Sequence, residues 1–373
     1  MNEPLTDAPP LTCAVFGGGN GWGKRIAGVL AESSTIVHIV EKQDGADAAA
    51  AAIAASDAVF IAIPDEAIDA LLHAYRTTLQ GKLILDCATN KSGFSESLQQ
   101  LAAAGNSVCS THPMAASTGV LLGQNALIMP IGANASGADS LAQAIYGALG
   151  MHCRRIDFRH HAELMAVLQM LPHVVQRLLI DALGRGLAEL DIGVGELGGL
   201  ASANYLLAEL GLGRVAAQRP EISAGIIATA LREPFGQTLL DDLRQNLTHI
   251  RQAGQSRAAL EQLFSDGTQR LDPTGNWRHA MAASSEAALV RLGNLRSRAL
   301  TIEAPNRIGM LRDVLIVLAD HGIDMTALDS QLLQDAAGRE RVNFDIAISN
   351  ETVPREALGV ELARIGAQLS DDV

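Results

Sequence analysis

The residue types best suited to chemistry gather first in a glycine-rich segment near the start of the chain. Residues 17–23 read GGGNGWG, directly after an apolar run that predicts a β-strand and before a helical pattern. Backbone amides in such a turn, and the N-terminus of the following helix, can hold a pyrophosphate that approaches closely. We therefore predict a dinucleotide site made of Gly17, Gly18, Gly19, Asn20, Gly21, Trp22 and Gly23.

Two residues refine this predicted dinucleotide site. In the pattern Gly-x-Gly-x-x-Gly that ends at Gly23, the middle glycine is replaced by Asn20. Asn tolerates the left-handed backbone better than most residues, so we expect the turn to form around it. Glu41 ends the second predicted strand, where an acid bonds a ribose 2′-hydroxyl and repels a 2′-phosphate. This acid favours NAD over NADP as the cofactor.

Two further segments place polar residues at predicted strand ends, where open α/β sheets bind their ligands. His112 stands before Pro113, which holds it in extended or turn geometry. Alone it fits a capping or packing role as well as catalysis, but a hydroxyl such as that of Thr89 can fix its tautomer and favours catalysis. Lys91 either neutralises an anionic substrate or caps a turn.

The middle of the chain offers three more polar residues in an apolar setting. Gln169 and His173 flank Pro172 inside an apolar helical pattern, and His173 fits a satisfied core histidine as well as a substrate contact. Arg214 follows a glycine in the weakly polar run LGLGRVAAQRPEI. Its guanidinium either reaches the surface or binds an anion, for which its planar shape suits a carboxylate.

The elements that must position these residues change in character along the chain. In the first third, short apolar runs alternate with helical patterns, which predicts a doubly wound, Rossmann-type parallel sheet. The predicted strands are 11–16, 35–40, 58–63, 83–86 and 126–130. From residue 160 to 292 the spacing is helical with almost no alternation, so we expect an all-α region. Several of its helices look apolar on more than one face, which predicts a homodimer.

The C-terminal segment has a third pattern. It predicts a strand at 299–303, a helix at 310–321, strands at 323–331 and 341–348, and a helix at 354–365, with Gly338 and Arg339 in a hairpin turn. This βαββα order forms an α+β domain of its own. We therefore expect three domains: a dinucleotide domain over 1–156, an all-helical substrate and dimerisation domain over 157–295, and the βαββα domain over 296–373.

Composition narrows the class of protein. The 373 residues are 48% hydrophobic and 18% charged, as in globular proteins, and the net charge of −13 disfavours a broad nucleic-acid surface. We find no uncharged apolar run of membrane length and no signal-peptide pattern at the start, so we expect a cytoplasmic protein without a membrane span. The four cysteines show no metal-type spacing, so we predict buried thiols and no metal site.

Taken together, these residues resemble the prephenate dehydrogenase family, the oxidoreductases of tyrosine biosynthesis. Thr89 and Lys91 are similar to the Ser and Lys of a loop in that family, with Thr in place of Ser. His112-Pro113-Met114 resembles the family's His-Pro-Met motif, with Ala116 where the family has Gly. The pair Gln169 and His173, and Arg214 before the Pro-led turn, resemble residues of the family's helical domain.

The resemblance implies an NAD-dependent oxidative decarboxylation of prephenate to 4-hydroxyphenylpyruvate. It implies that His112 takes the proton of the C4 hydroxyl as hydride leaves C4, and that Thr89 orients His112. Arg214 would hold a substrate carboxylate, with His173, Gln169 and Lys91 also at the substrate. The amino analogue arogenate stays open as an alternative substrate.

The C-terminal domain resembles the ACT family of amino-acid-binding regulatory domains. The matching loop is Ala304–Leu311, and the residues implied at an effector are Asn306, Arg307, Ile308, Gly309, Met310, Leu311 and Asp324. The resemblance implies pairing of two such domains and feedback by an aromatic amino acid, tyrosine above all. The alternative is a domain that only dimerises, since an exposed edge strand also serves association.

Two other functions compete with this interpretation. A β-hydroxyacid dehydrogenase would need a catalytic Lys in the helical domain, but residues 160–292 contain Arg and no Lys. A catalytically silent sensor of dinucleotide and amino acid would leave the joint presence of His112, Thr89 and Arg214 unexplained. Formation of NADH on adding prephenate separates the enzyme from the sensor.

Overall fold

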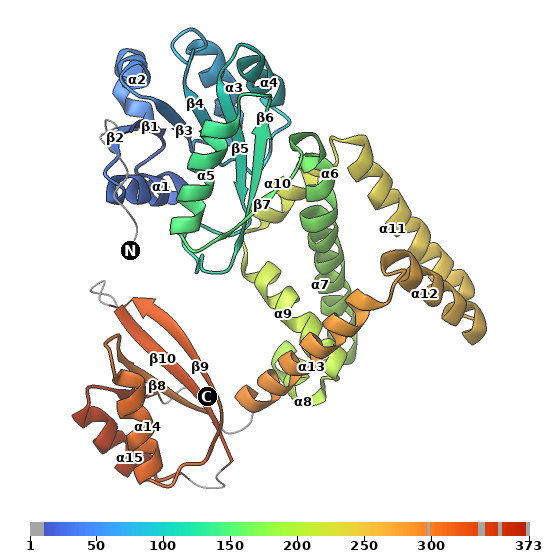
Figure 1. The fold of residues 1–373 in the computed structure, drawn as a ribbon. Coiled ribbons are helices and arrows are strands. Elements are labelled where there is room, and N and C mark those ends of the chain that lie inside the picture. The colour runs from blue at the N-terminus through green and yellow to red at the C-terminus, as the bar shows by residue number, and fades with distance from the viewer. Residues whose placement is uncertain (1–10, 297–298, 335–339, 350–352, 371–373) are drawn as a thin grey trace. The chain divides into compact units, whose positions relative to one another are not determined.

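The structure is a computed structural model that describes residues 11–296, 299–334, 340–349 and 353–370. The chain divides into two compact units (Figure 1). The first unit comprises Met1–Val175 and Gln218–Gln245, and the second comprises Gln176–Ala217 and Asn246–Val373. The division into three domains at residues 156 and 295 stays a prediction.

A seven-stranded sheet is the framework of the first unit, with strand order β2-β1-β3-β4-β5-β6-β7. All neighbouring strands are parallel except β5 and β6, which are antiparallel. The predicted strands coincide with β1 to β4 and β6. For β5 only a strand end before His112 was predicted, without bounds, and β7 was not predicted as a strand. The strands are β1 (Thr12–Phe16), β2 (Ile36–Val40), β3 (Ala58–Ile61), β4 (Leu83–Asp86), β5 (Ser107–Pro113), β6 (Asn125–Ile131) and β7 (His152–Arg155).

Helices cover both faces of this sheet, as expected for a doubly wound fold. One core joins α1 (Gly21–Glu32) and α5 (Ser136–Ala148) to strand residues such as Val15 and Phe60. The opposite core takes the alternating strand residues, and the helices on that side are α2 (Gly45–Ala54), α3 (Asp65–Ala74) and α4 (Ser95–Ala103). Because successive side chains of a strand point to opposite faces, each apolar run serves both cores.

Helices dominate residues 158–296, which confirms the predicted helical region. They are η2 (Phe158–His160), α6 (His161–Met165), η3 (Ala166–Met170), α7 (Leu171–Leu190), η4 (Val194–Glu196), α8 (Leu197–Leu200), α9 (Ala203–Ala217), α10 (Pro220–Ala230), α11 (Pro234–Ala253), α12 (Arg257–Leu271) and α13 (Asn276–Arg296). The segment η3 is a π-helical turn. Pro172 lies two residues after this turn. A proline inside a helix excludes the regular bond to the carbonyl four residues earlier, so a widened turn fits there.

One helical stretch among the described residues, Phe158–Leu190, is long and apolar enough to cross a membrane, by length and composition only. This differs from the expectation that no segment reaches that length. Helices of soluble proteins pass the same test, so the stretch is weak evidence for a span. Only 22% of its most apolar window is buried, and the exposed side chains include Val167, Leu168, Val175, Leu178 and Leu179.

The C-terminal part of the second unit is a small α+β fold with sheet order β11-β8-β10-β9, all antiparallel. Its two helices bury apolar side chains against one face of the sheet. The predicted βαββα order is confirmed and extended by the short final strand β11. Gly338 and Arg339 lie outside the described residues. The elements are β8 (Ala299–Pro305), α14 (Met310–Asp320), β9 (Met325–Gln334), β10 (Glu340–Ile348), α15 (Arg355–Arg364) and β11 (Gln368–Leu369).

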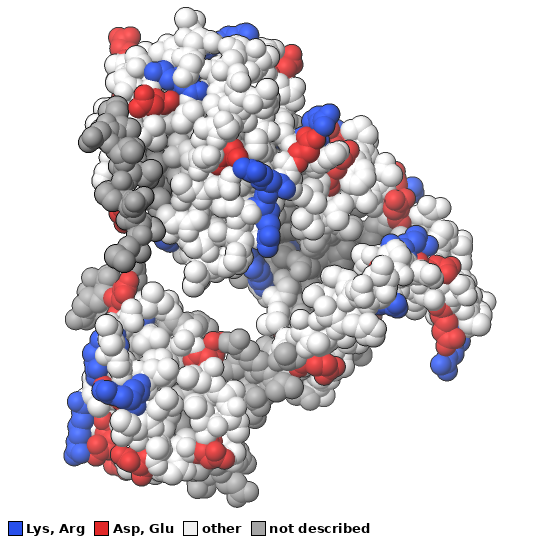
Figure 2. Space-filling model, in the orientation of Figure 1, with Lys and Arg blue, Asp and Glu red and all other residues white. Residues whose placement is uncertain are grey.

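Charged side chains are spread over the surface that Figure 2 draws. On that face the Lys and Arg of the described residues are dispersed among Asp and Glu. An anionic ligand therefore needs local positive charge, since the whole chain carries a net charge of −13.

Candidate functional site

The glycine turn between β1 and α1 is tightly packed against backbone. Gly17 has a φ of 75° and donates its N–H to the carbonyl of Val40 at 2.9 Å. A Cβ on Gly17 would lie 2.5 Å from the Ala62 carbonyl oxygen, and a Cβ on Gly23 would lie 2.1 Å from the Gly17 carbonyl oxygen. Both positions therefore exclude any side chain, because backbone atoms cannot move aside without opening the turn.

Asn20 does not take the role expected from the sequence. Its φ of −147° and ψ of 177° are extended, and the left-handed residues of the turn are Gly17 and Gly21. The prediction that Asn20 substitutes for a left-handed glycine is therefore wrong. Glycines occupy the left-handed positions of the turn, and Asn20 precedes α1 without a side-chain capping bond.

Glu41 lies where the acid of a dinucleotide fold is expected, directly after β2. Its Oε1 accepts the Gly19 N–H at 2.6 Å, so the carboxylate lies beside the glycine turn. Trp22 packs edge-on against Tyr146 with ring centroids 6.2 Å apart, which directs its indole toward the core of that face. The close backbone approaches at Gly17 and Gly23 fit a turn that holds a dinucleotide through its backbone.

A cavity of about 520 Å³ lies within the first unit, beside the carboxyl ends of β3 and β4. Its walls come from the start of α3, the loop after β4, the α6 and η3 segment, and the end of α10 with the turn that follows. Residues in those walls include Asp65, Thr89, Lys91, His161, Gln169 and Glu233. We call this cavity the edge cavity, and it lies at the edge where open α/β sheets bind ligands.

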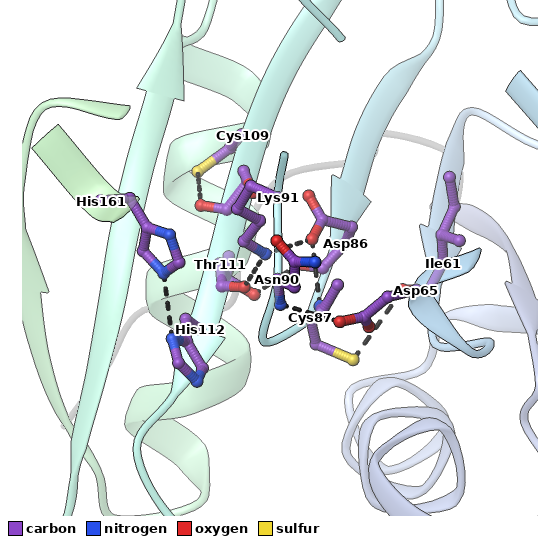
Figure 3. Close-up of polar contacts among 12 residues, drawn as sticks. Ile61, Asp65, Asp86, Cys87, Asn90, Lys91, Cys109, Thr111, His112 and His161 are labelled. Carbon is purple, nitrogen blue, oxygen red and sulfur yellow. Dashed lines mark hydrogen bonds and ion pairs between the residues drawn. The ribbon is translucent and has the colours of Figure 1, made fainter. Parts of the chain in front are cut away.

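Lys91 lies in the wall of the edge cavity, where two groups of the protein interior bind its ammonium. Figure 3 draws these contacts. The Lys91 ammonium forms an ion pair with the Asp86 carboxylate and donates to the Thr111 carbonyl at 2.7 Å. The Lys91 side chain is 5% exposed and that of Asp86 is not exposed at all. A buried ion pair is costly to break, so we expect the Lys91 ammonium to stay fixed in this position.

Two buried histidines from distant parts of the chain form a pair at the same site (Figure 3). Nδ1 of His112, on β5, lies 3.0 Å from Nε2 of His161, on α6. Burial, and secondarily the Lys91 ammonium, lower the pKa of His161 to about 3. Burial, Lys91 and His161 hold the pKa of His112 well below its usual range. Both imidazoles are therefore neutral near pH 7.

The other predicted residues of the first unit lie at or near the edge cavity. Thr89 lines it. Among the described residues, His112 is hydrogen-bonded to His161 and not to Thr89. Gln169 lines the cavity with its Nε2 4.0 Å from the Met114 sulfur. His173 is half-buried with its Nδ1 3.0 Å from the Ser223 hydroxyl. Their substrate roles stay predictions.

Arg214 lies in the second unit, near the end of α9. Nearby, Arg177 donates to the Val215 carbonyl at 2.9 Å, which fixes that end of α9 against α7. The role of Arg214 as a carboxylate-binding residue stays a prediction.

The predicted effector loop forms an exposed turn before α14. Gly309 is left-handed with a φ of 85°, and Ile308 is fully exposed. Asn306 donates its side-chain amide to a Glu340 carboxylate oxygen at 2.8 Å, and Arg307 pairs with Asp313 at 2.8 Å. The remaining predicted residues differ in setting, since Met310 is buried in the core, Leu311 is partly exposed and Asp324 accepts from the Ser349 hydroxyl.

His161 is the site residue that the sequence analysis missed. It stands four residues before Met165 and eight before Gln169, and all three line the edge cavity. That fourfold spacing places them on one helical face, which is the signal that could have found it. Among the described residues no group of three potential ligands could hold a metal ion.

The fold and the site define the first unit as a Rossmann-type nucleotide-binding domain with a cavity at the carboxyl edge of its sheet, lined by apolar and charged side chains. Residues 19–129 match the family described as prephenate dehydrogenase, nucleotide-binding domain. Over that segment the chain is similar to the prephenate dehydrogenase family.

One relative is also similar over part of its length. The chain is 29% identical over 201 residues to a 4-amino-4-deoxyprephenate dehydrogenase of Streptomyces pristinaespiralis, an alignment that covers 52% of this chain and 64% of that protein. It therefore spans less than two thirds of that relative's length.

Solved structures share the fold at low sequence identity. An arogenate dehydrogenase of Synechocystis is 18% identical, with a TM-score of 0.52, over 70% of this chain and 99% of that one. A prephenate dehydrogenase of A. aeolicus, in complex with hydroxyphenyl propionate and NAD+, is 15% identical, with a TM-score of 0.50, over 72% of this chain and 99% of that one.

Proposed function

We propose that the protein is an NAD-dependent dehydrogenase that converts prephenate to 4-hydroxyphenylpyruvate by oxidative decarboxylation. The observation that carries this proposal is the neutral His112 and His161 pair beside the edge cavity, in a fold whose glycine turn fits a dinucleotide. A neutral buried imidazole can accept a proton from a substrate hydroxyl. The resemblance of His112-Pro113-Met114 to the family motif supports the same role.

The chemistry divides between the cofactor and the chain. Bound NAD supplies the acceptor for the hydride that leaves C4 of the substrate. His112 takes the proton of the C4 hydroxyl at a ring nitrogen, so that a carbonyl forms at C4. The bond from C1 to the carboxylate then breaks, carbon dioxide leaves, and its electron pair makes the ring aromatic, with His112 returning the proton to the phenol oxygen.

A substrate that carries an amino group is the second candidate. Asp65, Glu66 and Glu233 line the edge cavity together with one arginine, Arg232. The charge of Lys91, which also lines the cavity, is already balanced by Asp86. Carboxylates favour an ammonium group through charge-assisted hydrogen bonds. Arogenate carries such a group, and the name of the Streptomyces relative specifies a ring amine.

The first experiment measures NADH or NADPH formation by the purified protein. Prephenate, arogenate and 4-amino-4-deoxyprephenate are supplied separately, each with NAD or NADP and with or without tyrosine. Formation of NADH with prephenate supports the proposed reaction, and a preference for an amino substrate supports the second candidate. No turnover with any pair would leave the silent-sensor function in its place.

Replacing His112 with Asn tests the proposed base. We expect kcat to fall by roughly 10²- to 10⁴-fold, with KM little changed, because the proton acceptor is lost while the fold keeps its shape. Steady-state kinetics of H112N is the measurement, with H249N as the control because His249 is exposed on α11. A loss smaller than tenfold would remove His112 from the role of base.

Replacing Arg214 with Gln tests the proposed carboxylate contact. A charge-assisted hydrogen bond contributes about 1.5 to 3 kcal/mol, so we expect KM to rise by roughly 10- to 150-fold with kcat less affected. Steady-state kinetics of R214Q measures KM and kcat. An unchanged KM would make Arg214 a structural or surface residue.

The C-terminal domain is proposed to bind an aromatic amino acid, tyrosine above all, and to regulate the enzyme. The exposed Ile308 beside the left-handed Gly309 supports a ligand-binding turn. Exposed apolar side chains along α7 support a homodimer, which we propose to be cytoplasmic. Inhibition by tyrosine in the NADH assay tests the regulation, and sedimentation at several concentrations tests the dimer.

A further inference from the structure

The histidine pair joins two parts of the first unit that are far apart in sequence. His112 ends β5 and His161 begins α6, and their rings meet edge to face with centroids 5.2 Å apart. Both residues are buried, His112 at 2% and His161 at 3% exposed. Within the described residues neither imidazole bonds a carboxylate, so His161 stands where an acid commonly orients a catalytic histidine.

A hydrogen bond between two neutral imidazoles requires one ring to donate and the other to accept. If His161 donates from Nε2, then Nδ1 of His112 accepts and the proton of His112 sits on Nε2, where no further proton can be taken. If His112 donates from Nδ1, its Nε2 keeps a free electron pair. Only the second arrangement leaves His112 able to act as a base at Nε2.

We propose that His161 is the positioning residue that accepts a hydrogen bond from Nδ1–H of His112 and thereby fixes the base-competent tautomer of His112. This inference rests on the proposed function of His112. As His112 takes the substrate proton at Nε2 and becomes an imidazolium, the Nδ1–H bond to the neutral His161 strengthens. His161 lines the edge cavity, and in this proposal it acts on the reaction through His112.

The surrounding charges keep His161 in the neutral form. Lys91, from the loop after β4, is the ammonium that faces both rings, and it is fixed by Asp86 on β4 and by the Thr111 carbonyl on β5. On α6 itself Glu163 is exposed. A fixed positive charge near His161 disfavours a second one on its ring, so His161 stays neutral, which its role as an acceptor requires.

Nitrogen-15 NMR of histidine-labelled protein tests the tautomer directly and needs no substrate. The protein is compared with H112N, which assigns the His112 signals, and with H161F and H161Q. We expect His112 to carry its proton on Nδ1 in the unaltered protein and in H161Q, whose amide oxygen can replace the Nε2 acceptor. In H161F the phenyl ring offers no acceptor, so we expect the proton of His112 to move from Nδ1 to Nε2.

Kinetics of the same variants gives the second readout. We expect kcat to fall by roughly 10- to 100-fold in H161F with KM nearly unchanged, and to recover most of that loss in H161Q. H160F is the matched control, since His160 is the adjacent residue and is exposed. A merely structural role for His161 would lower thermal stability in H161F and H161Q alike, without rescue of kcat by Gln.

The two readouts separate the inference from the function beneath it. An Nε2–H tautomer of His112 in the unaltered protein, or an Nδ1–H tautomer that persists in H161F, overturns the inference even if prephenate is turned over. An Nδ1–H tautomer that depends on position 161 supports the inference. The same tautomer without turnover of any substrate overturns the proposed function, because the pair would then form without serving a reaction.

Discussion

The turn between β1 and α1 and the turn between β8 and α14 both place a left-handed glycine between a strand and a helix, yet they are built differently. The turn between β1 and α1 is closed, since a Cβ on Gly17 or Gly23 would meet backbone oxygens at 2.5 and 2.1 Å. The turn before α14 is open, since the nearest atom to a Cβ on Gly309 is the end of the Arg312 side chain at 3.5 Å. The closed turn requires glycine for space, and the open turn requires it for φ alone.

This difference bears on how each turn would meet a ligand. The closed turn is fixed by its own packing, so it offers a ligand a preformed set of backbone amides. The open turn leaves Ile308 fully exposed, so a ligand there would cover an apolar side chain that is otherwise in contact with solvent. A rigid cofactor site and an adaptable effector site are therefore expected from the two turns.

The largest expected effect comes from G23A in the closed turn. Its Cβ would overlap the Gly17 carbonyl, and such overpacking costs about 3 kcal/mol of the free energy of unfolding. We also expect NAD binding to weaken by roughly tenfold or more, because a loss of about 1.4 kcal/mol of binding free energy already raises the dissociation constant tenfold. Denaturant unfolding and NAD titration are the measurements.

The matched control for G23A is G28A, on the same helix. Gly28 is exposed and a Cβ there would meet nothing within 4 Å, so we expect a gain of about 1 kcal/mol from helix propensity. If G23A were as well tolerated as G28A, the closed packing of the first turn would be contradicted.

A smaller effect is expected from G309A in the open turn. The left-handed φ of 85° costs a residue with a Cβ about 1 to 2 kcal/mol, but the space around it is free. Unfolding of the C-terminal domain measures the loss, with G359A inside α15 as the control. A loss as large as that of G23A would show that the second turn is closed as well.

The smallest effect is expected from N20G. Asn20 is extended and makes no capping bond, so glycine relieves no strain and removes no contact. We expect the free energy of unfolding to fall by no more than about 1 kcal/mol, from added chain flexibility, with NAD affinity nearly unchanged. A gain in affinity of tenfold would mean that the Asn20 side chain obstructs the pyrophosphate.

Much of the fold could be predicted from the sequence, and the exceptions share a cause. Apolar runs marked β1 to β4 and β6, because their side chains enter cores on both faces of the sheet. The strand β5 reads SVCSTHP, and only its end was predicted, since its polar residues are buried through remote partners. Thr111, for example, lies 2.7 Å from the Tyr146 hydroxyl and donates to the Asp86 carbonyl.

The candidate site was predicted in part for the same reason. The sequence pointed to His112 through its place before Pro113, and to Lys91 through its place after β4. It paired His112 with Thr89, whereas the structure pairs it with His161, 49 positions further along the chain. No local pattern specifies a partner at that separation.

The sequence by itself determined the order of the elements and the glycine turn, because strand periodicity, helix spacing and left-handed backbone depend on neighbouring residues. Tertiary structure alone decided which polar groups share the buried edge of the sheet: His161 against His112, and Lys91 between Asp86 and the Thr111 carbonyl. The physical reason is that a buried polar group must find a partner in space, and the fold, not the spacing along the chain, brings that partner within reach.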